Sequence, residues 1–512
     1  EVEDELLVRA EDVAERVLDD RQLREIRIEL PAEAWEKLRL ESLTPGPGMS
    51  LPSEKPYEYV QGNVSIDGLE IADVGIRKKG FFGSQDVDTP SLLVDFNRYV
   101  DQKPIKGLGR LTLNNNKQDT SLCSQLLAYR LFREAGIAAP RVGLARVTVN
   151  GRYLGIYANV ESIKRPFLED RFGDDGGALF EGTLTDLLPD SVAKIEAKFD
   201  DDPEANEQLA ALARVLAADG PLDVAALERL IDLDQFMTFW AVEGLIGFWD
   251  GYSNNQNNYF VYRDPSDGRF RFVPWGADAA FDTMPGFGGG MFGAGGNQGT
   301  PIVYAQSAIA NRLYFTPGFA DRYRARLEEV MAKVWDEEKL LAEIDRIEQL
   351  VARDLGDRQA NAPAEMERIR RFVRERRAAV EQALADWPVP APATYRQPMT
   401  TVAVGKLSGT FATVVSAGGG FGPGGEPDEA TGSTSGRIEG RLDERDVVVA
   451  EGTAAFRPFA FPGFGGGPGP RGPGGPGPGG PGPAGPGGPG PRGPRPGGAG
   501  PGPGGPGGPP AG

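Results

Sequence analysis

The sequence contains no histidine and only one cysteine, Cys123, among its 512 residues. The absence of histidine excludes serine triads, Cys–His dyads and the usual zinc sites that include a histidine ligand. A single cysteine can form neither a disulfide within the chain nor a thiolate metal cluster. Cys123 falls on the apolar side of an expected helix, so we predict a small buried side chain there rather than a nucleophile.

Long apolar runs and an excess of basic residues are also missing. No stretch approaches the ~20 apolar residues that a membrane-spanning helix needs. The formal net charge of −19 argues against nucleic acid or an anionic membrane as the main partner. The chain begins with Glu1 instead of Met, which is compatible with a signal peptide that has been removed.

Composition divides the chain into four predicted parts. Residues 1–23 form a leader segment, and residues 24–390 have the composition of a globular domain. Residues 401–458 hold short β-like pieces around a Gly-rich spacer, which predicts a small β appendage. Residues 459–512 are mostly Gly and Pro, but their glycines lose the every-third register of collagen. We therefore expect a disordered tail, partly in polyproline II conformation.

The first part of the globular zone alternates like an antiparallel sheet. Two strands are expected on either side of Asp67-Gly68 and two more around Asn150-Gly151, because both dipeptides favour tight hairpin turns. Between these hairpins lies one predicted helix.

The predicted helix covers residues 120–135. Asp119 and the residues after it are expected to cap its start, and Gly136 is expected to end it. It follows a glycine loop at 80–84 and a strand at 92–97.

After Glu161 the pattern becomes helical. Residues 207–220, 223–233 and 234–249 carry apolar side chains at helical spacing, and Asp234 is expected to cap the third of these helices. More helices follow, and the last is rich in arginine, which we expect to lie on a solvated, salt-bridged face.

The order of these elements predicts an α+β fold of the two-lobed protein-kinase-like type. The β-rich N-lobe would cover about 24–161 and the helical C-lobe about 162–390. The small C-terminal β appendage and the disordered Gly/Pro-rich tail would follow.

A β-hairpin in the C-lobe would bring polar side chains together at its open end. Residues 259–263 and 269–273 alternate at period two, so they are predicted to pair antiparallel. This pairing places Asn258 close to Asp278, with Asp250 a short loop upstream. Phosphoryl transfer needs oxygen ligands for Mg²⁺ and an Asp that orients the attacking hydroxyl. Loop residues chosen for turn formation, with an Asp that caps a helix, explain the same pattern.

Several longer motifs resemble the spore coat protein H (CotH) kinase family, whose members are atypical secreted kinases with a kinase-like fold. The resemblance runs from roughly residue 24 to residue 388, and its motifs occur in the family's order. They are IRKKGFFGS, DFNRYVDQKPIKGLGRLTLNNNKQDTS, LAYRLFREAGIAAPRVGLARVTVNGRYLGIYANVE, and WDGYSNNQNNYFVYRD with RFVPWGADAAF.

The resemblance implies ATP-dependent phosphorylation of Ser or Thr in a protein substrate, with Mg²⁺ or Mn²⁺ as the metal. Asp250 would be the catalytic-loop acid, and Asn257, Asn258 and Asp278 would bind the metal. The family also implies a secreted or cell-surface location in a bacterium.

The nucleotide would lie against the glycine loop. In this resemblance Arg77, Lys79, Gly80 and Ser84 would lie near phosphate oxygens, and Glu161 would lie at the hinge between the lobes.

Three departures from the family pattern bear on activity. Many relatives carry a lysine in the segment that aligns with Thr89, a charged side chain where Gln125 stands, and an additional acid at Gly276. A Lys–Glu pair that fixes the phosphates would then be missing, and activity would either be weak or depend on Lys78 or Lys79 instead.

Other functions therefore remain open. They are a nucleotide-binding pseudokinase, a surface scaffold or adhesion module without catalysis, and a nucleotidyl transferase that moves AMP. Residues 287–299, rich in Gly and Phe, are either a substrate loop or an insertion.

Overall fold

The computed structural model describes residues 15–43, 57–199, 202–281 and 301–397, and the backbone of residues 406–407, 432–442 and 445–456. The predictions for the start of the leader, for the 287–299 stretch and for the 459–512 tail lie outside these residues. The boundaries of the four predicted parts stay predictions.

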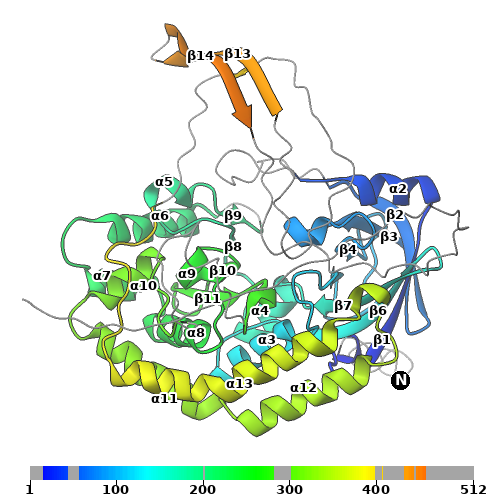
Figure 1. Ribbon diagram of the computed structural model, residues 1–512, viewed down its shortest axis with the longest axis horizontal. Coiled ribbons are helices and arrows are strands. Elements are labelled where there is room, and N and C mark those ends of the chain that lie inside the picture. The colour runs from blue at the N-terminus through cyan, green and yellow to red at the C-terminus, as the bar shows by residue number, and fades with distance from the viewer. Residues whose placement is uncertain are drawn as a thin grey trace, which may run out of the picture. The chain divides into compact units, whose positions relative to one another are not determined.

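Seven N-terminal strands close into a barrel in the order β1-β2-β3-β4-β5-β7-β6 (Figure 1). Neighbouring strands pair antiparallel except β1 and β6, which run parallel and complete the closure. Strand β1 alternates buried and more exposed residues, as a strand with one face on a core does. The strands are β1 (Leu23–Glu29), β2 (Val60–Ile66), β3 (Leu69–Lys78), β4 (Leu92–Asp95), β5 (Arg110–Asn114), β6 (Val142–Val149) and β7 (Arg152–Val160).

Both predicted hairpins are confirmed. Asp67 and Asn150 adopt left-handed φ angles of 49° and 48°, and the glycine after each is also left-handed. A two-residue turn of this kind matches the twist of the flanking strands. Strand β1 and helix α2 (Ala32–Leu40) were not predicted.

Helix α3 (Ser124–Ala135) begins later than predicted. Leu122 has a left-handed φ of 62°, which interrupts the helical path, and Cys123 stands at the N-cap without a side-chain bond. Asp119 is therefore not the N-cap, although its carboxylate accepts the Gln125 N–H at 3.2 Å. Gly136 ends the helix with a φ of 97°, as predicted. Cys123 is fully buried, as predicted.

The C-terminal part is mainly helical, around a sheet with the strand order β11-β10-β8-β9. Its core is one large apolar cluster that reaches from α3 to the last long helix. The elements are α4 (Arg165–Phe172), β8 (Leu179–Gly182), α5 (Pro189–Val192), β9 (Glu196–Ala197), α6 (Pro203–Ala217), α7 (Val224–Leu230), α8 (Leu233–Leu245), α9 (Tyr252–Asn255), β10 (Tyr259–Arg263), β11 (Phe270–Pro274), α10 (Ala308–Tyr314), α11 (Phe319–Val334), α12 (Glu337–Val351) and α13 (Ala362–Ala385). Short 3-10 turns are η2 (Phe82–Gln85), η3 (Ala277–Ala279) and η4 (Asp357–Gln359).

The start of α8 corrects another predicted cap. Asp232, not Asp234, is the N-cap, because its carboxylate accepts the Gln235 N–H at 3.1 Å. Asp234 lies in the first turn and forms an ion pair with Arg326.

The arginine-rich face of α13 is salt-bridged, as predicted. Arg370 pairs with Asp345 at 2.7 Å and also with Glu348. Arg370 and Arg376 are both buried rather than solvated, and Arg376 differs because it donates to a backbone group, the Leu245 carbonyl oxygen at the end of α8, at 2.9 Å.

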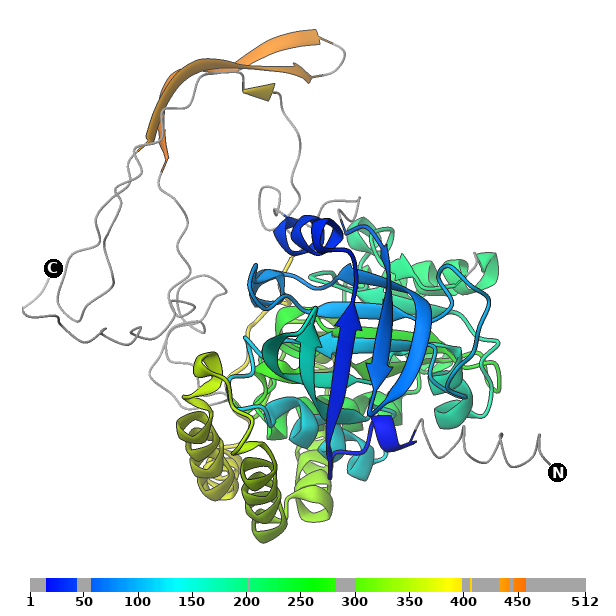
Figure 2. The same cartoon turned by 90° about the vertical axis from the view of Figure 1, so that its right-hand side faces the viewer.

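The link between α12 and α13 packs against the barrel, and Figure 2 shows these yellow-green helices beside the blue and cyan strands. Gln359 donates to the Ile156 carbonyl oxygen at 2.7 Å and accepts the Ile156 N–H at 2.9 Å. The Tyr153 hydroxyl donates to the Asp354 carbonyl oxygen. The prediction of an α+β chain with a β-rich N-terminal part and a helical C-terminal part is confirmed.

Three further strands lie within the segment predicted to be β-rich. They are β12 (Lys406–Leu407), β13 (Gly432–Leu442) and β14 (Arg445–Phe456), paired in that order. Among the described helices, none has the length and apolar character needed to cross a membrane.

Candidate active site

The hairpin β10–β11 forms with the predicted pairing. Tyr259 lies opposite Pro274, and one step further the Trp275 N–H donates to the Asn258 carbonyl oxygen at 3.0 Å. The segments that carry Asp250 and Asp278 therefore meet at the open end of the hairpin.

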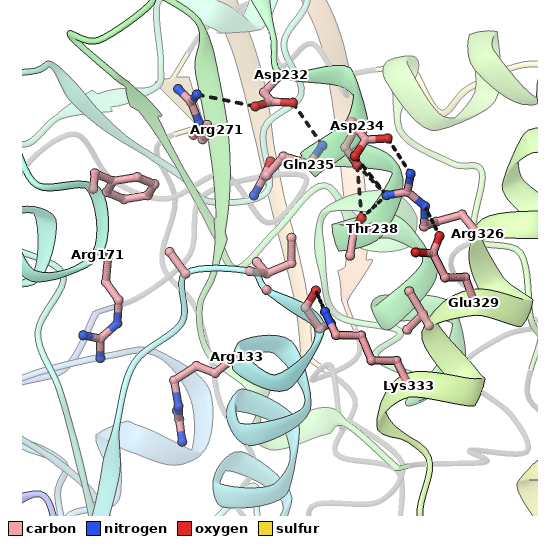
Figure 3. Close-up of a pocket in the computed structure, with 16 residues that line it drawn as sticks. Arg133, Arg171, Asp232, Asp234, Gln235, Thr238, Arg271, Arg326, Glu329 and Lys333 are labelled. Carbon is pink, nitrogen blue, oxygen red and sulfur yellow. Dashed lines mark hydrogen bonds and ion pairs between the residues drawn. The ribbon is translucent and has the colours of Figure 1, made fainter.

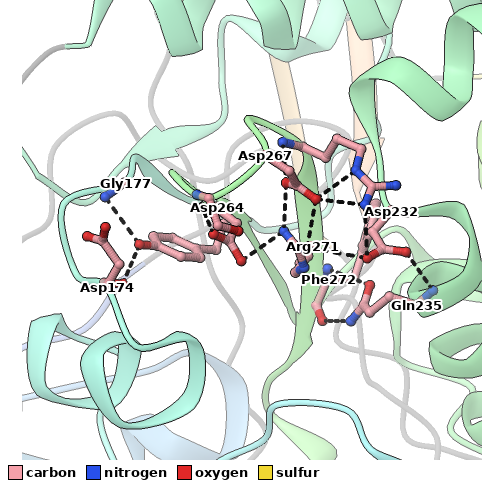
Figure 4. Close-up of polar contacts among 11 residues, drawn as sticks. Asp174, Gly177, Asp232, Gln235, Asp264, Asp267, Arg271 and Phe272 are labelled. Carbon is pink, nitrogen blue, oxygen red and sulfur yellow. Dashed lines mark hydrogen bonds and ion pairs between the residues drawn. The ribbon is translucent and has the colours of Figure 1, made fainter.

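The closed end of the hairpin is fixed to the start of α8 (Figure 4). Arg271 pairs with Asp264 and with Asp267, each at 2.9 Å. Gln235 exchanges two hydrogen bonds with the backbone of Phe272, at 2.6 and 3.0 Å. These contacts tie the turn of the hairpin to β11, and the middle of β11 to the start of α8.

Asp250 is surrounded by amide donors. Its Oδ1 accepts Asn255 Nδ2 at 2.5 Å and Asn257 Nδ2 at 3.2 Å, and its Oδ2 accepts Asn258 Nδ2 at 2.8 Å. Desolvation raises the pKa of Asp250, and the three amides work against that shift. The predicted residues Asp250, Asn257 and Asn258 thus lie together, and Asn255 joins them although it was not predicted.

A buried carboxylate on α8 anchors the loop that follows Asp250. Glu243 is fully buried and accepts the backbone N–H groups of Tyr252 and Ser253 at 2.8 and 2.9 Å. Burial raises the pKa of Glu243 to about 7. A methyl group on Gly251 would lie 2.1 Å from Glu243 Oε1, so a side chain there would have to displace this buried carboxylate. Sequence reasoning missed Glu243, although it is the one acid in the apolar run from 236 to 249.

Asp278 completes a group of three carboxylates. Desolvation, with the negative charges of Asp250 and Asp119, raises the pKa of Asp278 to about 7. Lys79 and the Asn114 side chain act in the opposite direction. Asp119 and Asn114 were not predicted as site residues. The sequence feature that could have indicated these two residues is the polar run between the predicted strand and the predicted helix.

The alternative role of Asp278 as a helix cap is not what the structure shows. Asp278 lies inside η3, and Gly276 stands at its N-cap with a left-handed φ of 50°. A methyl group on Gly276 would lie 2.5 Å from Asn258 Oδ1, which shows how closely the two ends of the hairpin approach.

The two adjacent lysines have different surroundings. Lys78 is fully buried, and its Nζ donates to the carbonyl oxygens of Arg39 and Glu41, both at 2.7 Å. Lys79 is half-buried, and desolvation lowers its pKa to about 8 against the attraction of Asp278. Of the two lysines, Lys79 is thus the one whose charge interacts with Asp278.

The glycine loop is compact. Gly80 has a left-handed φ of 81°, and a methyl group there would lie 2.5 Å from Ser84 Cβ. Ser84 is buried under the loop. Arg77 donates to the Lys78 carbonyl oxygen at 3.0 Å, and its guanidinium lies 5.4 Å from the centre of the Tyr59 ring.

Asn115 ties this loop to the end of β5. Its Nδ2 donates to the carbonyl oxygens of Gly83 at 2.9 Å and Thr89 at 2.7 Å. The Thr89 hydroxyl donates to Asp86 Oδ1 at 3.0 Å, so this position shapes the loop. Gln125 is buried, and its Nε2 has no hydrogen-bond partner within the part of the chain that the structure describes.

Glu161 lies between β7 and α4, where the barrel meets the helical part, and its role near the nucleotide stays a prediction. Its buried carboxylate accepts the Arg141 N–H at 2.9 Å and pairs with the Arg141 guanidinium at 2.6 Å and with Arg171 at 3.2 Å. These ion pairs hold the junction between β7 and α4, so the carboxylate is occupied by the protein itself.

The carboxylate and amide oxygens of the site, from Asp250, Asn257, Asn258 and Asp278, suit a hard cation that keeps part of its water shell. Across residues 15–43, 57–199, 202–281 and 301–397, no three Asp, Glu, His or Cys side chains are arranged to hold a metal ion by themselves. Mg²⁺ is usually bound by one or two carboxylates together with substrate phosphates and water. Asp278 fits this use, because a bound cation would offset the negative charges of Asp250 and Asp119 that raise its pKa.

A separate cavity of about 690 Å³ opens near the first turns of α8 (Figure 3). Arg326 pairs there with Asp234 and, at 3.1 Å, with Glu329, while Lys333 donates to the Ala135 carbonyl oxygen at 3.2 Å. Helix α8 is about 20 Å long at 1.5 Å per residue, and Asp250 follows its far end. The residues around this cavity tie α11 to α8 and to the end of α3, and they include none of the Asp250 group.

Comparison with known proteins identifies the family. The sequence profile of the CotH kinase protein family matches residues 76–380. The chain belongs to the CotH kinase family. Membership confirms the resemblance found in the sequence and implies protein kinase activity and the use of ATP.

Individual relatives are more distant. Inner spore coat protein H of Bacillus subtilis (strain 168) is 24% identical over 297 residues, which cover 54% of this chain and 76% of that protein. Invasin CotH3 and invasin CotH2 of Rhizopus delemar are 41% and 39% identical over 59 residues, which cover 11% of this chain and 10% of each invasin. Among solved structures, the proinflammatory kinase CtkA of Helicobacter pylori is 12% identical, with a TM-score of 0.30 over 60% of this chain and 94% of that chain.

Proposed function

We propose that this CotH kinase transfers the γ-phosphoryl group of ATP to a Ser or Thr hydroxyl of a protein substrate, with Mg²⁺ as the metal. The observation that supports this most directly is the open end of the hairpin, where Asn258 donates to Asp250 Oδ2 at 2.8 Å and lies against Gly276, two residues before Asp278. The charge of Asp250 raises the pKa of Asp278, and the charge of Lys79 acts in the opposite direction. Two carboxylates and a lysine that interact in this way are an arrangement suited to a cation and to phosphate oxygens.

Asp250 orients the acceptor in this proposal. The acceptor oxygen forms a bond to the γ-phosphorus while the bond from phosphorus to the β–γ bridging oxygen breaks. ADP leaves with that electron pair, and the acceptor proton passes to the Asp250 carboxylate. A raised pKa makes this carboxylate a better proton acceptor than a solvated Asp.

Asp278 and the Asn258 amide oxygen would hold Mg²⁺, with Asn257 next to them. When bound, the ion offsets the negative charge that the phosphates and the carboxylates share. Lys79 would contact a phosphate oxygen and replace the family lysine missing at Thr89. Arg77, Gly80 and Ser84 would shape the phosphate-binding loop, and Glu161 would position the segment between the two lobes.

The nucleotide would lie between the barrel and the helical part, as in a two-lobed protein-kinase-like fold. A secreted or cell-surface location fits the names of the relatives, a spore coat protein and two invasins.

The test is transfer of label from γ-labelled ATP with Mg²⁺ or Mn²⁺, to a Lys-rich and to an acidic acceptor protein. Asp250→Asn and Asp278→Asn are expected to lose at least about 100-fold in activity, since each removes a charge used in the transition state. Asp345→Asn is the matched control, because its carboxylate pairs with Arg370 between α12 and α13.

Equal activity in all three variants would overturn the proposed roles. Label that appears only from α-labelled ATP would identify an AMP transferase. If no label is transferred but Mg·ATP raises the melting temperature, the chain is a nucleotide-binding pseudokinase. If no label is transferred and Mg·ATP leaves the melting temperature unchanged, the chain is a scaffold without catalysis.

A further inference from the structure

We infer that Arg396 is a positioning residue for the catalytic loop, and that the segment 387–397 is part of the catalytic apparatus. Arg396 lies beyond residue 380, where the family profile ends. The inference rests on the proposed function, because it assigns Arg396 a role through the neighbours of Asp250.

The guanidinium of Arg396 binds the last residue of α9, Asn255, and the residue after it, Gln256. Nη1 donates to Asn255 Oδ1 at 2.8 Å, Nη2 donates to the Asn255 carbonyl oxygen, and Nε donates to Gln256 Oε1 at 3.0 Å. Asn255 in turn donates from Nδ2 to Asp250 Oδ1 at 2.5 Å. One side chain thus connects the C-terminal segment to the proposed catalytic carboxylate through a single amide.

The chemistry of the amide explains why this contact matters. The side chain of Asn has a donor end and an acceptor end of nearly equal size, so its orientation is set by its partners. Because Arg396 can only donate, it holds Oδ1 on its own side and leaves the NH₂ group facing Asp250. Without Arg396, a flipped Asn255 would present an oxygen to the carboxylate and repel it.

Gln256 is held in the same way. Its Oε1 faces Arg396, and its Nε2 donates to Asp186 Oδ2 at 2.8 Å and to the Arg396 carbonyl oxygen at 3.0 Å. Gln256 also has a left-handed φ of 53°, which is unfavourable for a residue with a side chain. A backbone of this kind persists when several contacts hold it, and Arg396 makes contacts from both its side chain and its main chain.

The segment before Arg396 is fixed along α10. The Tyr314 hydroxyl donates to the Val389 carbonyl oxygen at 2.7 Å, and Asn311 Nδ2 donates to that of Pro392 at 2.8 Å. The Arg396 N–H donates to the Gln306 carbonyl oxygen at 2.8 Å. These contacts run from the end of α13 to the catalytic loop, so the guanidinium approaches Asn255 from a supported backbone.

The experiment compares full-length wild type with Arg396→Ala, Arg396→Lys and the control Arg370→Ala. Arg370 is a buried arginine whose hydrogen bonds go to α12 and which also pairs with Glu367 on α13, away from the catalytic loop. We expect Arg396→Ala to lower kcat by about tenfold or more, with the KM for ATP changed less than about twofold, because it disturbs alignment rather than nucleotide binding. Arg396→Lys should recover part of the loss, since it keeps one donor but not the fork.

Amide hydrogen exchange of the peptide 250–258 is the second measurement, made well below the melting temperature of every variant. It should become faster in Arg396→Ala and stay at the wild-type rate in Arg370→Ala. A kcat within about twofold of wild type in Arg396→Ala, or an equal loss in Arg370→Ala, would overturn the inference. If wild type transfers no phosphate, the proposed function fails, and exchange alone decides whether Arg396 positions the loop.

Discussion

Lys78 and Lys79 show how one step along a strand separates two functions. Successive side chains of a strand point to opposite faces. Lys78, the last residue of β3, is buried and ends against two backbone carbonyl groups, whereas Lys79, the next residue, is half-buried and its charge interacts with Asp278. The motif of two basic residues therefore combines a structural lysine with a candidate phosphate ligand.

The alanine variants of these two lysines should differ in kind. Lys79→Ala should lose at least about 100-fold in phosphoryl transfer, because it removes a cation proposed to contact phosphate, while its stability stays within about 1 kcal/mol of wild type. Lys78→Ala should lower the free energy of unfolding by about 2–3 kcal/mol, because two buried carbonyl groups lose their donor. Urea unfolding and label transfer on the same preparations separate the effects. A Lys79→Ala enzyme with normal activity would assign the phosphate contact to another residue.

Single residues could be predicted where a local pattern fixed their place. Asp250, Asn258 and Asp278 were brought together by the register of one hairpin, which the alternation of its strands determines. Asp119 and Glu243 could not be found this way. Asp119 reaches the site only through the packing of α3 against η3, and Glu243 through the fold of the loop after α8, and neither arrangement is encoded within a few residues.

At the scale of elements, the short turn η3 shows what a side chain at Gly276 would meet. Gly276 has a left-handed φ of 50°, and the space for its side chain is filled by Asn258 Oδ1. In this arrangement the Asn258 amide occupies the space that a carboxylate side chain at residue 276 would need. The departure at Gly276 is therefore coupled to the position of Asn258.

Restoring the acid should consequently lower activity. Gly276→Asp and Gly276→Ala are both expected to reduce kcat by about tenfold, because either side chain displaces Asn258 from Asp250. Gly268→Ala is the matched control, since Gly268 also has a left-handed φ, 72°, but its nearest neighbour would lie 3.7 Å from the added methyl. Steady-state kinetics and melting temperatures of the three variants decide the matter. Higher activity in Gly276→Asp would mean that the acid and Asn258 fit together after all.

Helices and strands could be predicted where the sequence pattern that determines them lies within a few neighbouring residues. Dipeptide turns gave both barrel hairpins, and apolar spacing gave α6 and α8 to within a few residues. The start of α3 was wrong because Leu122 takes a left-handed φ, which no propensity for leucine suggests. Strand β1 was missed because it is completed by a parallel partner, β6, more than a hundred residues away.

At the scale of the whole molecule, the charge of −19 bears on which substrates reach the site. The described site itself holds three carboxylates close together, with Lys79 among them. Long-range attraction and repulsion depend on this overall charge and change the rate of encounter rather than the chemical step. A cationic acceptor is favoured by such a field, and an anionic acceptor is disfavoured.

Salt should therefore affect acceptor peptides according to their sign. Between 50 and 500 mM NaCl the Debye length shrinks from about 14 Å to about 4 Å, which screens most surface attraction. The KM for a Lys-rich Ser/Thr peptide is expected to rise about threefold or more, while kcat changes little. An uncharged peptide of the same length is the control and should show a nearly constant KM, and an acidic peptide should bind better as salt increases. If all three peptides respond alike, salt acts on the enzyme itself, and the acidic surface plays no part in selecting the substrate.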